Sequence, residues 1–147
     1  MEKVKVLLYR GTGFVSQVIR WRTWGDYAHV AMLVRGKVYE SIERKGVVCA
    51  SQDYHLGKRL PTKVLQIELP SLVVDKIEEW CKSKVGDKYD YTAIYGFIVR
   101  RDRQSNGKWF CSEYVTEAFK HAGVDLFLRT PSWKISPQLV SISPILH

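Results

Sequence analysis

The feature that most constrains the fold is a change of pattern halfway along the chain. Short β-rich runs occupy the first half, at residues 4–9, 27–34, 37–42, 46–49 and 62–69. In the second half, apolar residues recur at helical spacing instead. Strands followed by helices favour an α+β domain in which an antiparallel sheet packs against helices. The sequence has no internal repeat and no flexible linker, so we expect one domain over residues 1–147.

Two longer helices are predicted in this second half. Ser71 can cap the first, and Gly86 can end it. Its apolar stripe consists of Val74, Ile77, Trp80, Cys81 and Val85. The second helix ends at Gly123 and carries a stripe of Cys111, Tyr114, Val115, Ala118, Phe119 and Ala122. Shorter helices are expected at residues 14–21 and 91–99, and the proline-containing tail is expected to have little regular structure.

The charge of the chain favours anionic partners. The formal net charge is +8 and the pI is near 9.5, which suits nucleic acid, anionic lipid or bacterial wall polymers. The basic residues are scattered, and the one tight cluster, at residues 100–103, is interpreted as a solvated loop. No specific nucleic-acid binding is expected, because no helix-turn-helix, zinc finger or stacking platform is recognisable.

The N-terminal run reads as a strand and not as a targeting segment. Residues 1–9 carry charges among their apolar residues and lack the apolar core and cleavage site of a signal peptide. No apolar run is long enough to cross a bilayer. We therefore expect synthesis in the cytoplasm, with any delivery to a cell wall by a phage or by another route.

The number and spacing of the cysteines argue against a fold held together by disulfides or by a metal ion. Cys49, Cys81 and Cys111 are widely spaced, with no C-x-x-C pair and no Cys/His cluster, so neither a disulfide, a metal site nor a cofactor is predicted. Cys49 and Cys81 are interpreted as packing residues. Cys111 falls in the first turn of its predicted helix, where the helix dipole and unpaired N–H groups favour the nucleophilic thiolate. A buried core cysteine is the alternative for this position.

His29 is the candidate base, and the hairpin around it offers a test. If Arg35 and Gly36 form a two-residue turn, Glu40 falls on the face of His29 at a diagonal position, about 7–8 Å away between backbones. A carboxylate there can hold one imidazole nitrogen and leave the other for a thiol. A three-residue turn would instead place Glu43 opposite His29. A hydrogen-bonded structural role is the alternative for a histidine in an apolar strand.

The other histidines are weaker candidates. His55 falls in a polar loop expected at residues 51–61, His121 lies near a helix C-terminus, and His147 is the last residue.

Three segments of the chain, taken in order, resemble one family. They are Gly-Asp-Tyr-Ala-His-Val-Ala-Met at residues 25–32, Val-Tyr-Glu-Ser at 38–41 and Trp-Phe-Cys-Ser-Glu-Tyr-Val at 109–115. They are similar to the YiiX-like permuted papain-like hydrolases, which are circularly permuted relatives of the NlpC-type cell-wall peptidases. Gly-Asp-Lys-Tyr-Asp at 86–90 is similar to the approach to that family's cysteine helix. The resemblance covers residues 4–123.

The resemblance implies a papain-like, circularly permuted NlpC-type fold with an antiparallel sheet or small barrel. It implies that Cys111 is the nucleophile, His29 the base and Glu40 the third polar residue. Tyr89 would line the pocket or bind an oxyanion. One departure is Ala28, because the family usually has serine before the histidine.

The favoured function is therefore a cysteine hydrolase that cleaves a peptide or isopeptide bond through an acyl-enzyme, with peptidoglycan peptides as a substrate suited to the positive charge. An alternative is a lipid acyl hydrolase or acyltransferase with the same site, for which Trp21, Trp24 and Trp133 could contact an interface. A third is a non-catalytic basic module that binds polyanions through residues 100–103 and Lys108.

Overall fold

The computed structural model describes residues 1–11, 14–91 and 107–147, and its elements follow the predicted order of mainly strands and then mainly helices. The strands are β1 (Glu2–Tyr9), β2 (His29–Val34), β3 (Lys37–Ile42), β4 (Gly46–Ser51), β5 (Lys63–Leu69), β6 (Lys88–Tyr89) and β7 (Lys108–Trp109). The helices are α1 (Phe14–Thr23), α2 (Gln52–Lys58), α3 (Ser71–Lys84), α5 (Cys111–His121), the 3-10 turn η1 (Ser132–Lys134) and α6 (Pro137–Val140). The expected helix at residues 91–99 and the basic cluster at residues 100–103 lie outside the described residues.

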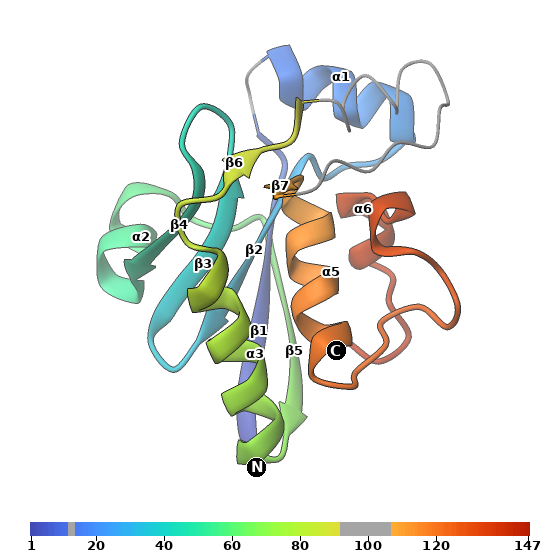
Figure 1. The fold of residues 1–147 in the computed structure, drawn as a ribbon. Coiled ribbons are helices and arrows are strands. Elements are labelled where there is room, and N and C mark those ends of the chain that lie inside the picture. Colours follow the sequence, from blue (N-terminus) through green and yellow to red (C-terminus); the bar gives the residue numbers. More distant parts are fainter. Residues whose placement is uncertain (12–13, 92–106) are drawn as a thin grey trace.

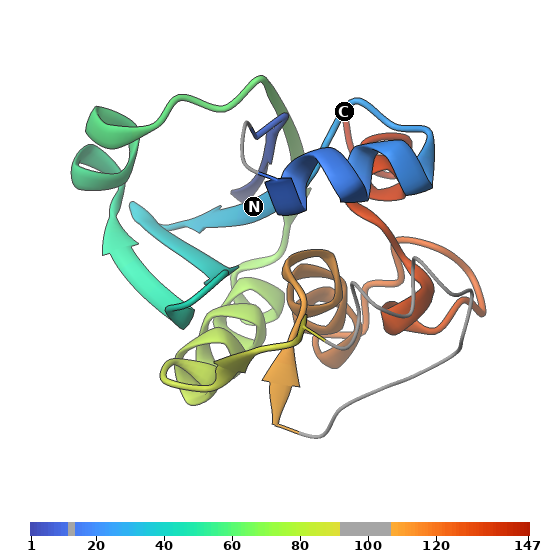
Figure 2. The ribbon, with the colours of Figure 1, turned by 90° about the horizontal axis from the view of Figure 1, so that it is seen from above.

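A five-stranded sheet in the order β4-β3-β2-β1-β5 forms the centre of the fold. All of its neighbouring strands are antiparallel, whereas β6 and β7 form a separate short parallel pair. Figure 2 shows α3 and α5 side by side on one face of the sheet, with α2 on the other side. The predicted α+β class and antiparallel sheet are confirmed.

The hairpin between β2 and β3 has the two-residue turn that the sequence predicted. Val34 pairs with Lys37, and both turn residues have positive φ, 48° at Arg35 and 76° at Gly36. This is the conformation of the type I′ turn, whose twist matches that of the flanking strands. The register that places Glu40 on the same face as His29 is therefore correct.

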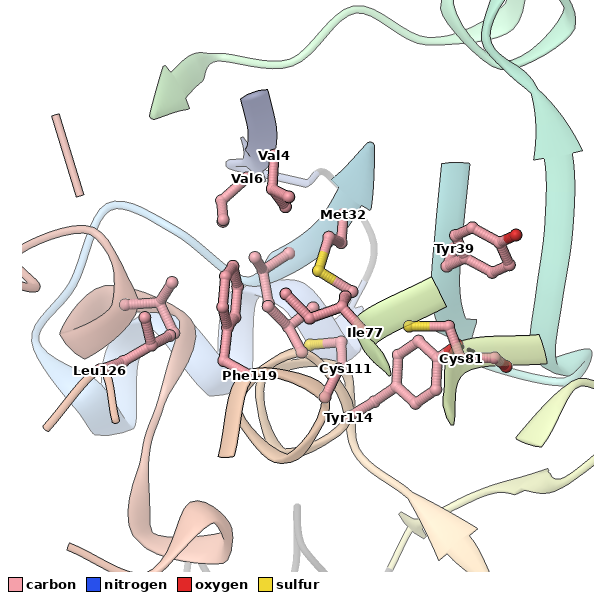
Figure 3. Packing of buried hydrophobic residues seen from close by; sticks show 14 of the residues in the cluster. Val4, Val6, Met32, Tyr39, Ile77, Cys81, Cys111, Tyr114, Phe119 and Leu126 are labelled. Atoms are coloured by element: carbon pink, nitrogen blue, oxygen red, sulfur yellow. Dashed lines mark hydrogen bonds between the residues drawn. The ribbon is translucent and has the colours of Figure 1, made fainter. Parts of the chain in front are cut away.

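The main core fills the space between the sheet and the two long helices. Figure 3 shows Cys111 and Phe119 of α5 and Ile77 of α3 packed with Val6 of β1 and Met32 of β2. A smaller cluster, Leu7, Tyr9, Ala31, Leu33 and Val38, occupies the opposite face of the sheet. None of the helices in the described ranges is long and apolar enough to cross a bilayer.

Two predictions about local structure around the sheet are wrong. Residues 52–58 of the expected polar loop form α2, and the Ser51 side chain caps it by accepting a hydrogen bond from the Tyr54 N–H at 3.3 Å. Cys49, expected to pack, is exposed because β4 is an edge strand of the sheet. Helix α2 was not predicted because it is short and mostly polar, so its sequence lacks the apolar periodicity that identifies longer helices.

The details of α3 and of the tail also differ from expectation. Pro70 is the N-cap of α3, and Ser71 is its first residue. Val85 lies at the helix end and is 46% exposed, so the apolar stripe ends at Cys81. The tail contains both η1 and α6, and Ser136 caps α6 by accepting a hydrogen bond from the Leu139 N–H.

Candidate active site

Cys111 is the first residue of α5, as predicted, and only 1% of it is exposed. The backbone that leads into this helix is held at Trp109, whose carbonyl oxygen accepts hydrogen bonds from the Ser41 hydroxyl at 2.6 Å and the Asp90 N–H at 3.1 Å. The Cys111 Sγ atom lies 3.9 Å from the carbonyl oxygen of Ala28. The start of α5 is thus placed against the residue that precedes His29.

His29 occupies the first position of β2, at the end of the sheet, and pairs with Tyr9 of β1. Its Nε2 atom lies 2.6 Å from Oε2 of Glu40. Burial by itself would lower the pKa of His29. Hydrogen bonds with Cys111 and then with Glu40 outweigh that effect and raise the pKa to about 9. Since Glu40 occupies Nε2, Nδ1 is the ring nitrogen left for the thiol.

Glu40 is the centre of a buried polar cluster and is 3% exposed. Besides His29, its carboxylate accepts a hydrogen bond from Arg59 Nη2 at 3.0 Å and lies 3.3 Å from His55 Nδ1. Burial acts to raise the pKa of Glu40, but the hydrogen bond and charge of His29 and the charge of Arg59 lower it. The carboxylate is therefore held ionised and its orientation is fixed from several sides.

His55, one of the weaker candidates from the sequence, is also part of this cluster. It is 7% exposed and packs against the sheet from α2, and its Nε2 atom lies 2.6 Å from the Tyr9 hydroxyl. Burial lowers the pKa of His55 and raises that of Tyr9 to about 12. The neutral imidazole can accept a hydrogen bond from the phenol and donate one from Nδ1 to Glu40.

The sequence of α2 contains a signal that could have predicted the contacts of His55 and Arg59 with Glu40. Ser51 can cap a helix with Asp53 in its first turn, and His55 and Arg59 are four residues apart, which places them on the same side of one turn. Both reach Glu40 in the structure. Arg59 also lies over the ring of Tyr9, 4.2 Å from its centroid.

A cleft of about 460 Å³ opens beside His29. Its wall includes Tyr89, as the resemblance implied, and also Glu43, which was the second candidate to hold the imidazole. Cys111 is not among the lining residues, but its neighbour in space, Ala28, is. Cys111 thus lies directly behind the part of the wall that Ala28 forms.

Tyr89 is fixed to the cleft wall by its backbone and its ring. Val47 of β4 exchanges two backbone hydrogen bonds with the segment before β6, at 2.8 Å with Asp87 and at 3.0 Å with Gly86. The Tyr89 ring lies 5.9 Å from that of Phe110, the residue before Cys111. Burial and then the charge of Cys111 raise the pKa of Tyr89, so its hydroxyl keeps its proton and can act as a hydrogen-bond donor.

The sequence matches no family model and no curated protein. The fold is similar to that of a solved structure described as the metalloprotein yiiX from Escherichia coli O157:H7, DUF1105. The TM-score is 0.73 at 20% sequence identity, and the alignment covers 99% of this chain and 94% of that one. This likeness shows a YiiX-like fold. It leaves the circularly permuted papain-like assignment as a hypothesis.

The residues that the structure describes do not fit a metal in the way that the description of that neighbour suggests. In the ranges that the structure describes, no group of three His, Cys, Asp or Glu side chains could hold a metal ion. Glu40, the carboxylate that His29 and His55 share, already contacts both of them and the cationic Arg59. A guanidinium at that place opposes the binding of a second cation.

Proposed function

We propose that this protein is a cysteine hydrolase that cleaves an amide bond through an acyl-enzyme. The observation that carries the proposal is the chain of contacts from Glu40 through His29 to Cys111. Cys111 comes from the α5 side of the sheet and Glu40 from β3, and His29 links them from the end of β2. A nucleophile, a base and a residue that orients the base form the arrangement that activates a thiol.

In the first half of the reaction, His29 Nδ1 takes the proton of Cys111, and Sγ attacks the carbonyl carbon of the scissile amide. The oxygen of the tetrahedral intermediate is stabilised by backbone N–H groups in the first turn of α5 and by the Tyr89 hydroxyl. His29 then donates the proton to the departing amine, and the C–N bond breaks to leave a thioester.

In the second half, His29 takes a proton from a water molecule, which attacks the thioester and releases the acid and the free thiol. Glu40 stays ionised throughout, because its lowered pKa reflects hydrogen bonds to donors that remain in place. Its part is to hold the ring so that Nδ1 faces Sγ and to stabilise the imidazolium that forms.

For the substrate we propose amide bonds in bacterial wall peptides. The support is the resemblance of the three sequence segments to the permuted wall hydrolases and the net charge of +8, which favours accumulation at anionic wall polymers. The test is to incubate the protein with peptidoglycan fragments and to measure new amine termini, with Cys111→Ser as the inactive variant. Amine release that is absent in Cys111→Ser supports the proposal, and unchanged fragments contradict it.

A second candidate keeps the same site and changes the acyl donor to a lipid ester. One observation favours it: Trp21 and Trp24 of the α1 region are 72% and 93% exposed. Acyl-lipid vesicles are therefore a parallel substrate in the same assay. Release of acyl chains, with untouched wall fragments, would move the substrate to the lipid class and leave the site residues unchanged.

A further inference from the structure

A second cavity, of about 340 Å³, adjoins the cleft that contains His29. We call it the basic pocket. The charged residues that line it in the described ranges are Arg44, Lys45, Lys88 and Lys108 with a single acid, Asp87. Its volume is within the range of small-molecule sites, and its four basic residues are all exposed. The charge of this wall favours an anionic ligand.

The backbone around the basic pocket is fixed by close contacts between two segments. Gly46 begins β4 with a φ of 77°, and a Cβ atom there would clash with the carbonyl oxygen of Asp87, so the approach requires glycine. The Arg44 N–H donates a hydrogen bond to the Tyr91 hydroxyl at 2.9 Å, and the Tyr91 ring lies 5.0 Å from that of Tyr89. The long basic side chains of the pocket therefore project from fixed backbone positions.

The positive charges of the basic pocket are not neutralised within the described part of the chain. No ion pair there involves any of its four cations. The Asp87 carboxylate instead accepts a hydrogen bond from Nε1 of Trp109 at 2.8 Å. Lys88 and Lys108 are direct partners in the β6–β7 pair, and both line the pocket. Like charges that face each other across neighbouring strands repel, so a bound anion would stabilise this arrangement.

The basic pocket lies directly beside the candidate active site. Tyr89 lines both cavities. The turn between β3 and β4 borders both as well, because Glu43 lines the cleft and Arg44 lines the pocket. Figure 1 shows β6 and β7 above the two long helices, toward the end of the molecule where α1 lies. A ligand longer than the pocket would therefore pass Tyr89 toward His29.

The kind and number of the cations favour a phosphate group over a carboxylate. Three of the four are lysines, whose ammonium groups act as point charges and suit phosphate oxygens that point in several directions. A carboxylate is matched best by the planar fork of an arginine, and Arg44 is the one arginine among the described lining residues. A phosphate monoester carries about 1.5 to 2 negative charges near pH 7, so it offsets more of the repulsion than one carboxylate does.

We propose that the basic pocket is a binding site for a phosphate group, with Arg44, Lys88 and Lys108 as its main contacts. The group belongs to a small phosphate ester or to a phosphodiester polymer. The proposal goes beyond the hydrolase activity and does not depend on it. Binding requires the cations of the pocket, whereas the proposed chemistry requires Cys111 and His29, so the two claims can fail separately.

The test is isothermal titration calorimetry of the full chain at low ionic strength with glycerol 3-phosphate, dimethyl phosphate and succinate. We expect at least one of the phosphate compounds to bind at least tenfold more tightly than succinate, whose charges are on carboxylates, and to bind more weakly as salt rises. The monoester stands for a small phosphate ester and the diester for the backbone of a polymer. Whichever binds more tightly identifies the source of the phosphate, and either result supports the proposal.

A double variant tests the two lysines that face each other. Lys88→Gln/Lys108→Gln keeps the length of the side chains but removes their charges, so it should bind the tighter phosphate compound at least tenfold more weakly. Its Tm without ligand should be no lower than that of the wild type, because the repulsion between the paired lysines is gone. Lys37→Gln/Lys63→Gln is the matched control. It removes two charges from exposed lysines outside the pocket and should bind as the wild type does.

A single substitution separates binding from stability. Arg44 has a φ of 71°, which glycine adopts readily, so Arg44→Gly should leave Tm unchanged or higher while it weakens phosphate binding several-fold. The proposal is overturned if neither phosphate compound binds more tightly than succinate, or if either pocket variant binds phosphate as tightly as the wild type. Equal loss of binding in the control variant would also overturn it, because net charge and not the pocket would then account for the affinity.

Discussion

The Nε2 atom of His29 and the Oε2 atom of Glu40 lie 2.6 Å apart, although the two residues occupy different strands and are not directly paired. The contact is diagonal across the β2–β3 hairpin, so it depends on the register that the Arg35-Gly36 turn sets. Because Glu40 occupies Nε2, Nδ1 is the ring nitrogen left for the Cys111 thiol in the proposed reaction. The backbone geometry of one turn thus brings the Glu40 carboxylate within reach of the His29 ring.

The first prediction concerns Glu40. Glu40→Gln keeps the size of the side chain but removes the charge that stabilises the imidazolium, so turnover should fall by roughly 10² to 10⁴. The protein should remain folded, as judged by its far-UV circular dichroism. Glu43→Gln is the control, because Glu43 lines the cleft while Glu40 makes the contact with His29. Strong loss in Glu43→Gln with little effect in Glu40→Gln would contradict the assignment.

The second prediction concerns the pH dependence of activity. The pKa of His29 is raised to about 9, chiefly by its hydrogen bonds with Cys111 and Glu40 against the opposing effect of burial. The protonated imidazole is therefore present below that pH and lost above it. The kcat/KM profile should fall on the alkaline side near pH 9. In Glu40→Gln this limb should move to lower pH, and an unmoved limb would argue against the contact.

The same raised pKa has a consequence for stability. A histidine whose pKa is higher in the folded than in the unfolded state stabilises the fold fully below its unfolded value, about 6.5. That contribution decreases as pH rises from there through about 9. The free energy of unfolding should therefore fall less over this range in His29→Gln than in the wild type, as measured by urea denaturation at several pH values. Equal pH slopes would contradict the shift.

The third prediction concerns Tyr9 and His55 as positioning residues. Tyr9→Phe removes the hydroxyl that contacts His55 at 2.6 Å, so His55 loses its partner and supports Glu40 less well. We expect kcat to fall about tenfold with little change in KM, and the alkaline limb of the profile to shift. Tyr54→Phe, on the exposed side of α2, is the control.

A double-mutant cycle distinguishes this role from a loss of packing. If Tyr9 acts through Glu40, the effect of Tyr9→Phe on kcat should largely disappear in the Glu40→Gln background. Additive effects of the two substitutions would mean that Tyr9 supports the fold alone.

The site divides into a part that local sequence predicts and a part that it does not. Cys111 could be placed at a helix start from the apolar stripe of α5, and Glu40 beside His29 from a two-residue turn, because both inferences use short-range geometry. The place of His55 and Arg59 in the site could not be predicted, because α2 is short and polar and because the direction in which it packs on the sheet is a tertiary property. The exposure of Cys49 likewise follows from its edge strand, which sequence alone does not reveal.

The most direct test of the account is the rate at which a small thiol reagent modifies Cys111. Iodoacetamide is added near pH 7 to Cys49→Ser, which lacks the exposed cysteine, and the modified residue is identified by peptide mass. Burial raises the pKa of Cys81 to about 12, so near pH 7 it stays protonated and serves as an internal unreactive thiol. We predict that Cys111 alone is modified and that adding His29→Ala slows its modification at least tenfold, since the imidazolium that stabilises the thiolate is gone. A Cys111 that does not react, or that reacts equally fast without His29, would contradict the proposed nucleophile and base.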